Sequence, residues 1–531
     1  MDSYELHESK HVHQVVVEAE DTVVANAYPG RRTEDTRDTR TRVRRVFSFA
    51  QIFFFALTYM SSWETMATAL AWGILIVAAG ALAQSASLAE MSSAQPIAGA
   101  QYVSCLPSNI NPSSTDTGVK HWTHALAPAK QRRFITWMQG WVTWFAWVSV
   151  LAGVANTSAY MLQSLIAANN PEYVPEAFHV TLIIFALLIF MGLMNMFTWF
   201  LIPWFELAAG ILHIVLFVIF VVVFVTLSPR KSADFVFLRS ASQTGWNNPF
   251  ISFNLGLMTP TWGFVGFDGA VHMSEEVRKA RHAIPRAMFY TIVINAVLAY
   301  SIILVILFCI QDMDAAVNSA FPIVEICMQV TGSLPATTAL VSGLIIISFA
   351  VTLGSIASAS RLTWAWARDG GLPAWFAHIS PRHRIPVRSI WLPIFIVLCL
   401  ACLNIASYAA FGAFIALASL ALFTSYAIAI SCMLRARLQG KVDYGGWNLG
   451  RWGVPVNIFA LVYSGWMMVI FCFPAYVPVT ATGMNYAFPI FAFVVLVALA
   501  LWFLQARKTW PGLNKEVIDL VLSDSDRNTK D

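Results

Sequence analysis

About twelve apolar runs dominate this sequence, most of them near the roughly 20 residues that a helix needs to cross a bilayer. They lie at residues 47–62, 67–89, 134–166, 178–201, 204–227, 250–271, 286–310, 336–360, 389–408, 410–433, 455–475 and 485–505. Only 12% of the 531 residues are charged, well below the share in a soluble domain. The sequence therefore predicts an all-α integral membrane protein, and a net charge of +4 gives no argument for a nucleic acid partner.

The positive charges between the runs predict the orientation of the chain. Loops that follow the even-numbered runs carry most of them: Lys130, Arg132, Arg133, Arg278, Lys279, Arg281, Arg286, Arg368, Arg382, Arg384, Arg388, Arg435, Arg437 and Lys441. Such loops stay in the cytosol, so both termini are expected there. We expect residues 1–46 to be a disordered cytosolic tail, residues 47–505 a twelve-helix domain, and residues 506–531 a second cytosolic tail.

Two runs contain residues that disfavour an unbroken membrane helix. The sixth holds Gly263, Gly266, Asp268 and Gly269, and the first ends with Ser61–Glu64. A glycine costs roughly 1 kcal/mol inside a helix, and a charged Asp roughly 2.5–3.5 kcal/mol at the bilayer centre. Chains tolerate both where a helix breaks beside a solvated cavity, and breaks five spans apart fit inverted repeats. We expect a 5+5 inverted-repeat core with broken helices 1 and 6, plus two C-terminal helices.

The two breaks supply groups that recognise a zwitterion. Free N–H groups at a half-helix N-terminus suit a carboxylate, and unwound carbonyls suit an ammonium. Trp262 precedes the second break, and an indole face attracts cations. The expected substrate-binding residues are Ser61, Ser62, Trp63, Trp262, Gly263, Phe264, Val265 and Gly266. The alternative is that the glycines allow close helix packing and that Trp262 only packs.

Three ionisable residues are candidates for coupling or gating. Apolar surroundings favour the neutral form of a carboxyl group, which would let Asp268 take up a proton during a transport cycle. Glu64 lies at the opposite break, and His213 in the fifth run belongs to the residue type that titrates near neutral pH. The alternatives are a structural hydrogen bond for Asp268, exposure to water for Glu64 and packing for His213. Glu206 is expected at the membrane interface.

Charged residues also follow the sixth and eighth runs. The expected cytosolic salt-bridge gate consists of Glu275, Glu276, Arg361 and Arg368, and the alternative is a solvated run of charges. Ser355 and Ser358 in the eighth run could line a sodium site, which is the less favoured alternative to coupling by protons.

Four motifs occur in order along the chain: Ser61–Glu64, Ser87–Ser93 with Pro96–Tyr102, Gly266–Asp268 with His272–Val277, and Ala359–Pro373. Together they resemble motifs of the amino acid–polyamine–organocation superfamily, most closely its fungal GABA, choline and amino acid permeases. The resemblance implies alternating access, uptake driven by a proton gradient, and a small amine or amino acid as substrate. No cofactor and no metal are expected. We expect the plasma membrane as location, with the vacuolar membrane as the alternative.

The chain departs from this family pattern at two nearby places. Relatives carry a Gly-Gly-Pro loop after the first span, but here Ala69-Leu70-Ala71 runs directly into Trp72-Gly73-Ile74. Relatives also join Gln-Tyr to His-Trp directly, whereas residues 103–120 separate these pairs here. Val103-Ser104 is what a GTRAGT splice donor would encode, so we interpret residues 103–120 as a loop insertion that originates from a retained intron. An inactive product of a faulty gene prediction is then an alternative.

Three other functional classes compete with a transporter. A channel needs a polar stripe or rings of charge along several spans, but the polar residues here cluster at two breaks. The sequence contains no GxSxG motif of a hydrolase and no P-loop of an ATP-driven pump. A nutrient sensor on the same fold binds its ligand without net transport, and the sequence does not separate it from a transporter. GABA, choline, neutral amino acids and polyamines all stay open as ligands.

Overall fold

The computed structural model describes residues 46–60, 62–64, 71–94, 96, 127–128, 130–237, 245–319, 321–380, 385–406, 408–442, 444–474, 476–480 and 484–510, without the side chains of 406–415. One compact unit comprises Val43–His378 and Ile385–Asp531, and it contains every element discussed below. A second unit, Met1–Arg42 with Ile379–Arg384, is described only at residues 379 and 380. The predicted insertion at 103–120 and the candidate residue Ser61 lie outside the described residues.

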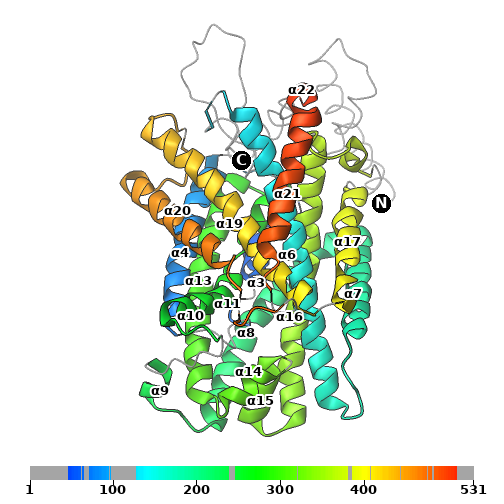
Figure 1. The fold of residues 1–531 in the computed structure, drawn as a ribbon, viewed down its shortest axis with the longest axis vertical. Helices are drawn as coiled ribbons and strands as arrows, with labels where there is room; N and C mark the ends of the chain where they lie inside the picture. Colours follow the sequence, from blue (N-terminus) through cyan, green and yellow to red (C-terminus); the bar gives the residue numbers. More distant parts are fainter. Residues whose placement is uncertain are drawn as a thin grey trace, which may run out of the picture. The chain divides into compact units, whose positions relative to one another are not determined.

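Among the described residues, ten helices are long and apolar enough to cross a membrane (Figure 1). They are α4 (Gly73–Ala94), α6 (Arg132–Asn169), α7 (Ala177–Phe197), α8 (Ile202–Leu227, after η2, Trp199–Leu201), α13 (Ala280–Cys309), α16 (Leu334–Arg368), α17 (Val387–Ala401, continued by α18, Leu403–Ala406), α19 (Tyr408–Leu438), α20 (Gly453–Ile470, after η5, Gly450–Trp452) and α21 (Ala487–Leu501, continued by η6, Trp502–Ala506, and α22, Arg507–Thr509). The prediction of an all-α membrane protein is confirmed.

The first and sixth predicted runs form interrupted helices. α3 (Phe49–Tyr59) begins at a Ser48 capping box and ends just before the predicted break. The sixth run forms α10 (Pro249–Gly256), α11 (Met258–Trp262), α12 (Gly269–His272) and η3 (Ser274–Glu276), with turns between α11 and α12. Both interruptions fall where the sequence placed them. The exact number of spans and the inverted repeat stay predictions.

Short helices that the sequence did not suggest fill the connections around α13. α9 (Ala233–Phe237) precedes α10, while α14 (Met313–Asn318) and α15 (Pro322–Thr331) join α13 to α16. The Asp312 side chain caps α14 by accepting a hydrogen bond from the Ala315 amide at 2.9 Å. α15 starts with a proline and ends at Gly332, whose φ of 57° is the left-handed conformation that favours glycine.

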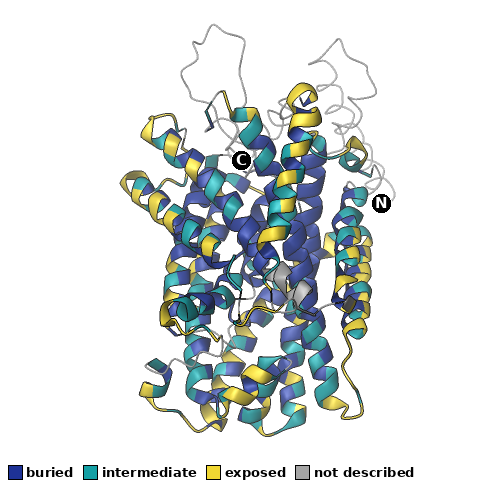
Figure 2. Ribbon diagram, in the orientation of Figure 1, coloured by how far each residue is buried: buried dark blue, intermediate teal, exposed yellow. Residues whose placement is uncertain are grey.

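The most buried of the ten membrane-length helices are α4, α6, α16 and α19, and Figure 2 shows mostly buried residues inside the bundle. The apolar windows of α4, α6 and α19 are each 72% buried and that of α16 is 67% buried, whereas only 17% of α21 is buried. Trp147, Trp366 and Tyr426 on these inner helices are among the largest fully enclosed side chains. A bilayer surrounds the outer helices, so their exposed apolar side chains are solvated by lipid. The inner helices are those that position the site.

Candidate functional site

The two interrupted helices meet inside the bundle. The Ser62 hydroxyl donates a buried hydrogen bond of 2.6 Å to the carbonyl oxygen of Gly263, 201 residues away in the sequence. Asn295 on α13 donates to the Leu57 carbonyl near the end of α3 at 3.1 Å, which satisfies an acceptor close to the first break. The sequence predicted that these breaks form one site, and the structure places them in direct contact.

Gly266 is the residue on which the shape of the second break depends. Its φ of +87° lies in the left-handed region that side chains disfavour. A Cβ added there would come within 2.5 Å of Cε1 of Tyr59. The Tyr59 ring lies 5.4 Å from the Trp147 ring, and its hydroxyl accepts a hydrogen bond from Ser355 at 3.1 Å. Tyr59 is therefore held against the break from two sides.

Asp268 ties the second break to the inner helices. Its carboxylate is fully buried and accepts hydrogen bonds from Trp147 Nε1 on α6, at 3.1 Å, and from the Tyr426 hydroxyl on α19. The Nε2 atom of His272 lies 3.5 Å from Oδ2 of Asp268, the oxygen that also accepts the hydrogen bond from Trp147. This arrangement matches the structural role that the sequence left as the alternative for Asp268.

Glu64 and His213 form a buried pair at the first break. His213 Nδ1 on α8 lies 2.6 Å from Glu64 Oε1, and the two side chains are 0% and 4% exposed. The Trp63 ring covers the imidazole at 5.7 Å. The alternative interpretation, that Glu64 is exposed to water, is therefore wrong. Among the described residues, neither His213 Nε2 nor Glu64 Oε2 has a hydrogen-bond partner.

Glu206, which the sequence places at the membrane interface, is a further carboxyl group inside the bundle. It is only 1% exposed, because α8 turns it toward α3 and α16. Its Oε1 lies 2.9 Å from where a Cβ of Gly354 would be, so the absence of a side chain at Gly354 makes room for it. Ser355 and Ser358, next to this glycine, donate hydrogen bonds to Tyr59 and to the Gly269 carbonyl.

One side of the site is closed by ion pairs. Glu276 and Arg361 lie 2.7 Å apart and are 2% and 3% exposed, and Glu275 lies 3.2 Å from Arg368. The structure therefore pairs all four residues predicted to form a gate, and the solvated run of charges does not fit the buried Glu276–Arg361 pair. The gating role itself stays a proposal.

Backbone hydrogen bonds reinforce this closure. The Val46 and Phe47 amides donate to the Glu276 carbonyl at 2.9 and 3.0 Å, and the Arg278 amide donates to the Phe47 carbonyl at 3.1 Å. The chain before α3 is thereby fixed to the segment after α12.

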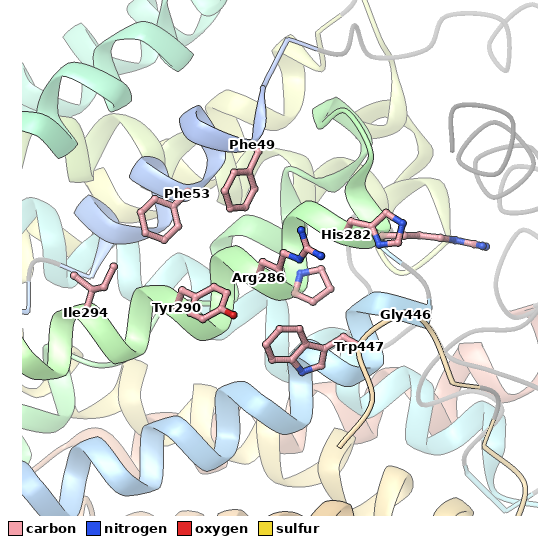
Figure 3. A pocket seen from close by; sticks show the side chains of 10 residues that line it. Phe49, Phe53, His282, Arg286, Tyr290, Ile294, Gly446 and Trp447 are labelled. Carbon is pink, nitrogen blue, oxygen red and sulfur yellow. The ribbon is translucent and has the colours of Figure 1, made fainter. Parts of the chain in front are cut away.

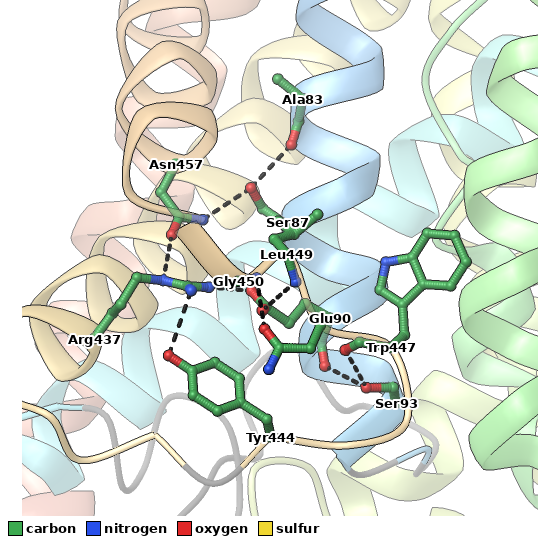
Figure 4. Close-up of polar contacts among 11 residues, drawn as sticks. Ala83, Ser87, Glu90, Ser93, Arg437, Tyr444, Trp447, Leu449, Gly450 and Asn457 are labelled. Atoms are coloured by element: carbon green, nitrogen blue, oxygen red, sulfur yellow. Dashed lines mark hydrogen bonds and ion pairs between the residues drawn. The ribbon is translucent and has the colours of Figure 1, made fainter. Parts of the chain in front are cut away.

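Another buried ion pair, between α4 and α19, belongs to a hydrogen-bonded cluster that also includes α20 (Figure 4). Arg437 contacts Glu90, whose other oxygen accepts a hydrogen bond from the Leu449 amide at 2.9 Å. Asn457 on α20 donates to the Ser87 hydroxyl at 2.9 Å and accepts from Arg437 at 3.2 Å. In the sequence, Glu90 directly follows the second apolar run, and its partners are far away along the chain.

The described candidate substrate residues are shielded except for one. Ser62, Trp63, Gly263, Phe264, Val265 and Gly266 are buried, whereas Trp262 at the end of α11 is partly exposed. Ser61 lies outside the described residues. A ligand therefore reaches the contact between the two breaks only if side chains or helices move.

The sequence also contains two spacings that are typical of metal ligands. Cys399 and Cys402 form a CxxC spacing, and both are free and exposed. His7–His11 has the HExxH spacing and falls outside the described residues. Within the described part of the chain, no group of three or more His, Cys, Asp or Glu residues could hold a metal ion.

Sequence comparisons place this architecture among membrane permeases. A sequence model described as amino acid permease matches residues 45–498, which include both breaks and the ion pairs. Amino-acid permease 2 of Neurospora crassa is 29% identical, with 88% of this chain and 86% of that protein covered. The choline transporter of Saccharomyces cerevisiae is 27% identical, with 90% of this chain and 84% of that protein covered.

Proposed function

Because the chain belongs to the amino acid permease family, we propose that it is a secondary active transporter that imports an amino acid or small amine by alternating access, in symport with protons. The observation that carries this proposal is the buried Ser62–Gly263 hydrogen bond. It brings two interrupted helices together where backbone groups are released from helical hydrogen bonding and become available to a ligand.

The substrate binds between the two breaks. Backbone amides at the second break bind the carboxylate, and backbone carbonyls at the two breaks bind the ammonium group in exchange for present partners such as Ser62 on the Gly263 carbonyl. Trp262 keeps an exposed surface beside the break and covers the cationic group of the ligand. Similarity to an amino-acid permease and to a choline transporter supports amines and amino acids, including GABA and choline, as the substrate class.

The Glu276–Arg361 and Glu275–Arg368 pairs form the inner gate. In the orientation that the positive-inside rule predicts, they lie on the cytosolic side with both termini. The structure then represents a state closed to the cytosol, and release of the substrate requires these pairs to open. We place the protein in the plasma membrane, with the vacuolar membrane as the alternative.

The Glu64–His213 pair carries the coupling proton. It is buried, short and directly adjacent to the Ser62 contact, so a change in its protonation alters the charge beside the first break. Asp268 acts instead as the anchor of the second break, because Trp147 and Tyr426 already occupy its carboxylate. Coupling by sodium is the alternative.

Uptake in a permease-deficient yeast tests the proposal. Radiolabelled GABA, choline, neutral and basic amino acids are offered at pH 5 and pH 7, using the full chain and a version without residues 103–120. Saturable uptake that rises at acid pH supports a proton symporter, and uptake that depends on sodium instead overturns the coupling. Glu64→Gln should lose the response to pH, whereas the exposed loop variant Glu172→Gln should keep it.

Surface protein is quantified for each variant. Saturable binding without uptake at the membrane, in both versions of the chain, would favour the sensor over the transporter. Uptake only by the version without residues 103–120 would place the fault in that segment.

A further inference from the structure

A cavity of about 590 Å³ lies apart from the two breaks, between α3, the first half of α13 and the loop before α20 (Figure 3). Phe49 and Phe53 of α3 face Arg286 and Tyr290 of α13, and Trp447 of the loop forms another wall. None of these groups belongs to the proposed transport site. The cavity therefore has a role of its own to be explained.

The cavity combines positive charge with aromatic surface. Arg281, His282 and Arg286 line it, and none of its lining residues among the described part of the chain is Asp or Glu. Arg286 is exposed and makes no ion pair with a described residue. Guanidinium groups present a planar set of donors that matches the oxygen atoms of a phosphate.

The loop wall of the cavity is firmly attached. The Trp447 carbonyl accepts a hydrogen bond of 3.0 Å from the Ser93 hydroxyl at the end of α4. The Trp447 ring lies 5.2 Å from the Phe289 ring and 6.2 Å from the Tyr290 ring. The cavity is thus a built concavity, and the loop does not merely cover a gap between helices.

Charge and apolar surface are separated along α13. His282 lies at one end of the cavity and Ile294 at the other, with Arg286 and Tyr290 between them, as Figure 3 shows. The twelve helical steps from residue 282 to residue 294 span about 18 Å. Beyond the charged end, Tyr290 is 47% and Val297 62% exposed on the outer face of the bundle. A ligand that fits this pattern has an anionic head and a long apolar chain.

We propose that the cavity binds an anionic phospholipid from the adjoining leaflet of the bilayer. The phosphate lies against Arg286, and an acyl chain follows Phe53, Tyr290 and Ile294. This rests on the proposed orientation, which puts the start of α13 at the cytosolic leaflet, where anionic lipids are concentrated. It does not depend on which substrate the protein transports.

Native mass spectrometry of the purified full chain tests this site, with dioleoyl phosphatidylserine and dioleoyl phosphatidylcholine as probes. We expect preferential binding of phosphatidylserine, weakened about fivefold by Arg286→Gln. Arg435→Gln removes another exposed arginine at the end of α19, outside the cavity, and should leave the affinity unchanged. Equal binding of both lipids, or equal effects of both variants, would overturn the proposal.

Two further experiments identify whether the bound anion is a lipid headgroup or free phosphate. Inorganic phosphate at millimolar concentration should not displace the lipid, and full displacement would indicate a site for free phosphate instead. Phosphatidylserine with brominated acyl chains should quench the fluorescence of Trp447, so Trp447→Phe should lose that part of the quenching. Unchanged quenching in this variant would place the lipid elsewhere. Neither readout requires transport, so failure here is distinguishable from failure of the proposed function.

Discussion

Gly266→Ala tests the geometry of the second break. A residue with a side chain costs about 1–2 kcal/mol in the left-handed conformation, and Gly266 has a φ of +87°. The new Cβ would also lie 2.5 Å from Tyr59, where about 3.5–4.0 Å is the optimal separation of two carbon atoms. Relief of such crowding in a packed core costs about 1–3 kcal/mol, because Ser355 and Trp147 restrain the Tyr59 ring.

The two terms together give about 2–5 kcal/mol against the observed break. Even the lower value corresponds to about a 30-fold loss in the population of the competent site. We expect uptake of the radiolabelled substrate at subsaturating concentration to fall at least about tenfold at equal surface expression. Gly465→Ala is the matched control, because nothing lies within 4 Å of the added Cβ in α20. Wild-type uptake by Gly266→Ala would refute the reasoning.

Three further predictions concern the proposed gate, the buried side chain of Trp510 and the buried thiol of Cys327. Arg361→Gln leaves Glu276 buried without its partner, which costs about 3–5 kcal/mol. Uptake by this variant should therefore fall more than uptake by the double variant Glu276→Gln/Arg361→Gln. Losses that simply add would exclude an energetic coupling between the two residues. Trp510→Ala should cost about 3–5 kcal/mol of stability and lower the melting temperature in detergent, unlike exposed Trp452→Ala; equal shifts would contradict the buried position. Burial raises the pKa of the Cys327 thiol to about 12, so the thiol stays protonated at neutral pH. Peptide mapping at pH 7.5 should therefore find Cys327 modified by maleimide only after the protein is denatured.

The positions of the breaks could be predicted from local sequence alone. Three glycines and Asp268 are costly in a membrane helix, and so the chain interrupts the sixth helix at these residues. The same local argument predicted the end of α3. Such costs depend on a residue and its immediate neighbours, and both are visible in the sequence.

The partners of the buried charges could not be predicted in this way. Trp147 and Tyr426 are 121 and 158 residues from Asp268, and His213 is 149 residues from Glu64. Their meeting depends on how the helices pack, which one sequence without pairing information does not specify. Glu206 was placed at the interface because its position along α8 could be estimated, whereas the direction of its side chain could not.

The pairing of the four residues of the proposed gate could be predicted for an electrostatic reason. Acidic residues after the sixth run and basic residues at the end of the eighth lie at the same predicted membrane face, where opposite charges attract. The sequence could not show that Glu276 and Arg361 would be buried, nor that the Phe47 backbone would pair with the same segment. Packing thus turned a plausible surface pairing into a closed side of the site.

Counterflow in proteoliposomes tests the central claim that the two broken helices bind a substrate and expose it alternately to each side. Purified protein is reconstituted, the vesicles are preloaded with unlabelled substrate found in the uptake panel, and labelled substrate is added outside. Our account predicts transient accumulation of label above equilibrium, lost in Gly266→Ala and retained in Gly465→Ala. Label that only equilibrates as through a channel, or binding without entry, would contradict it.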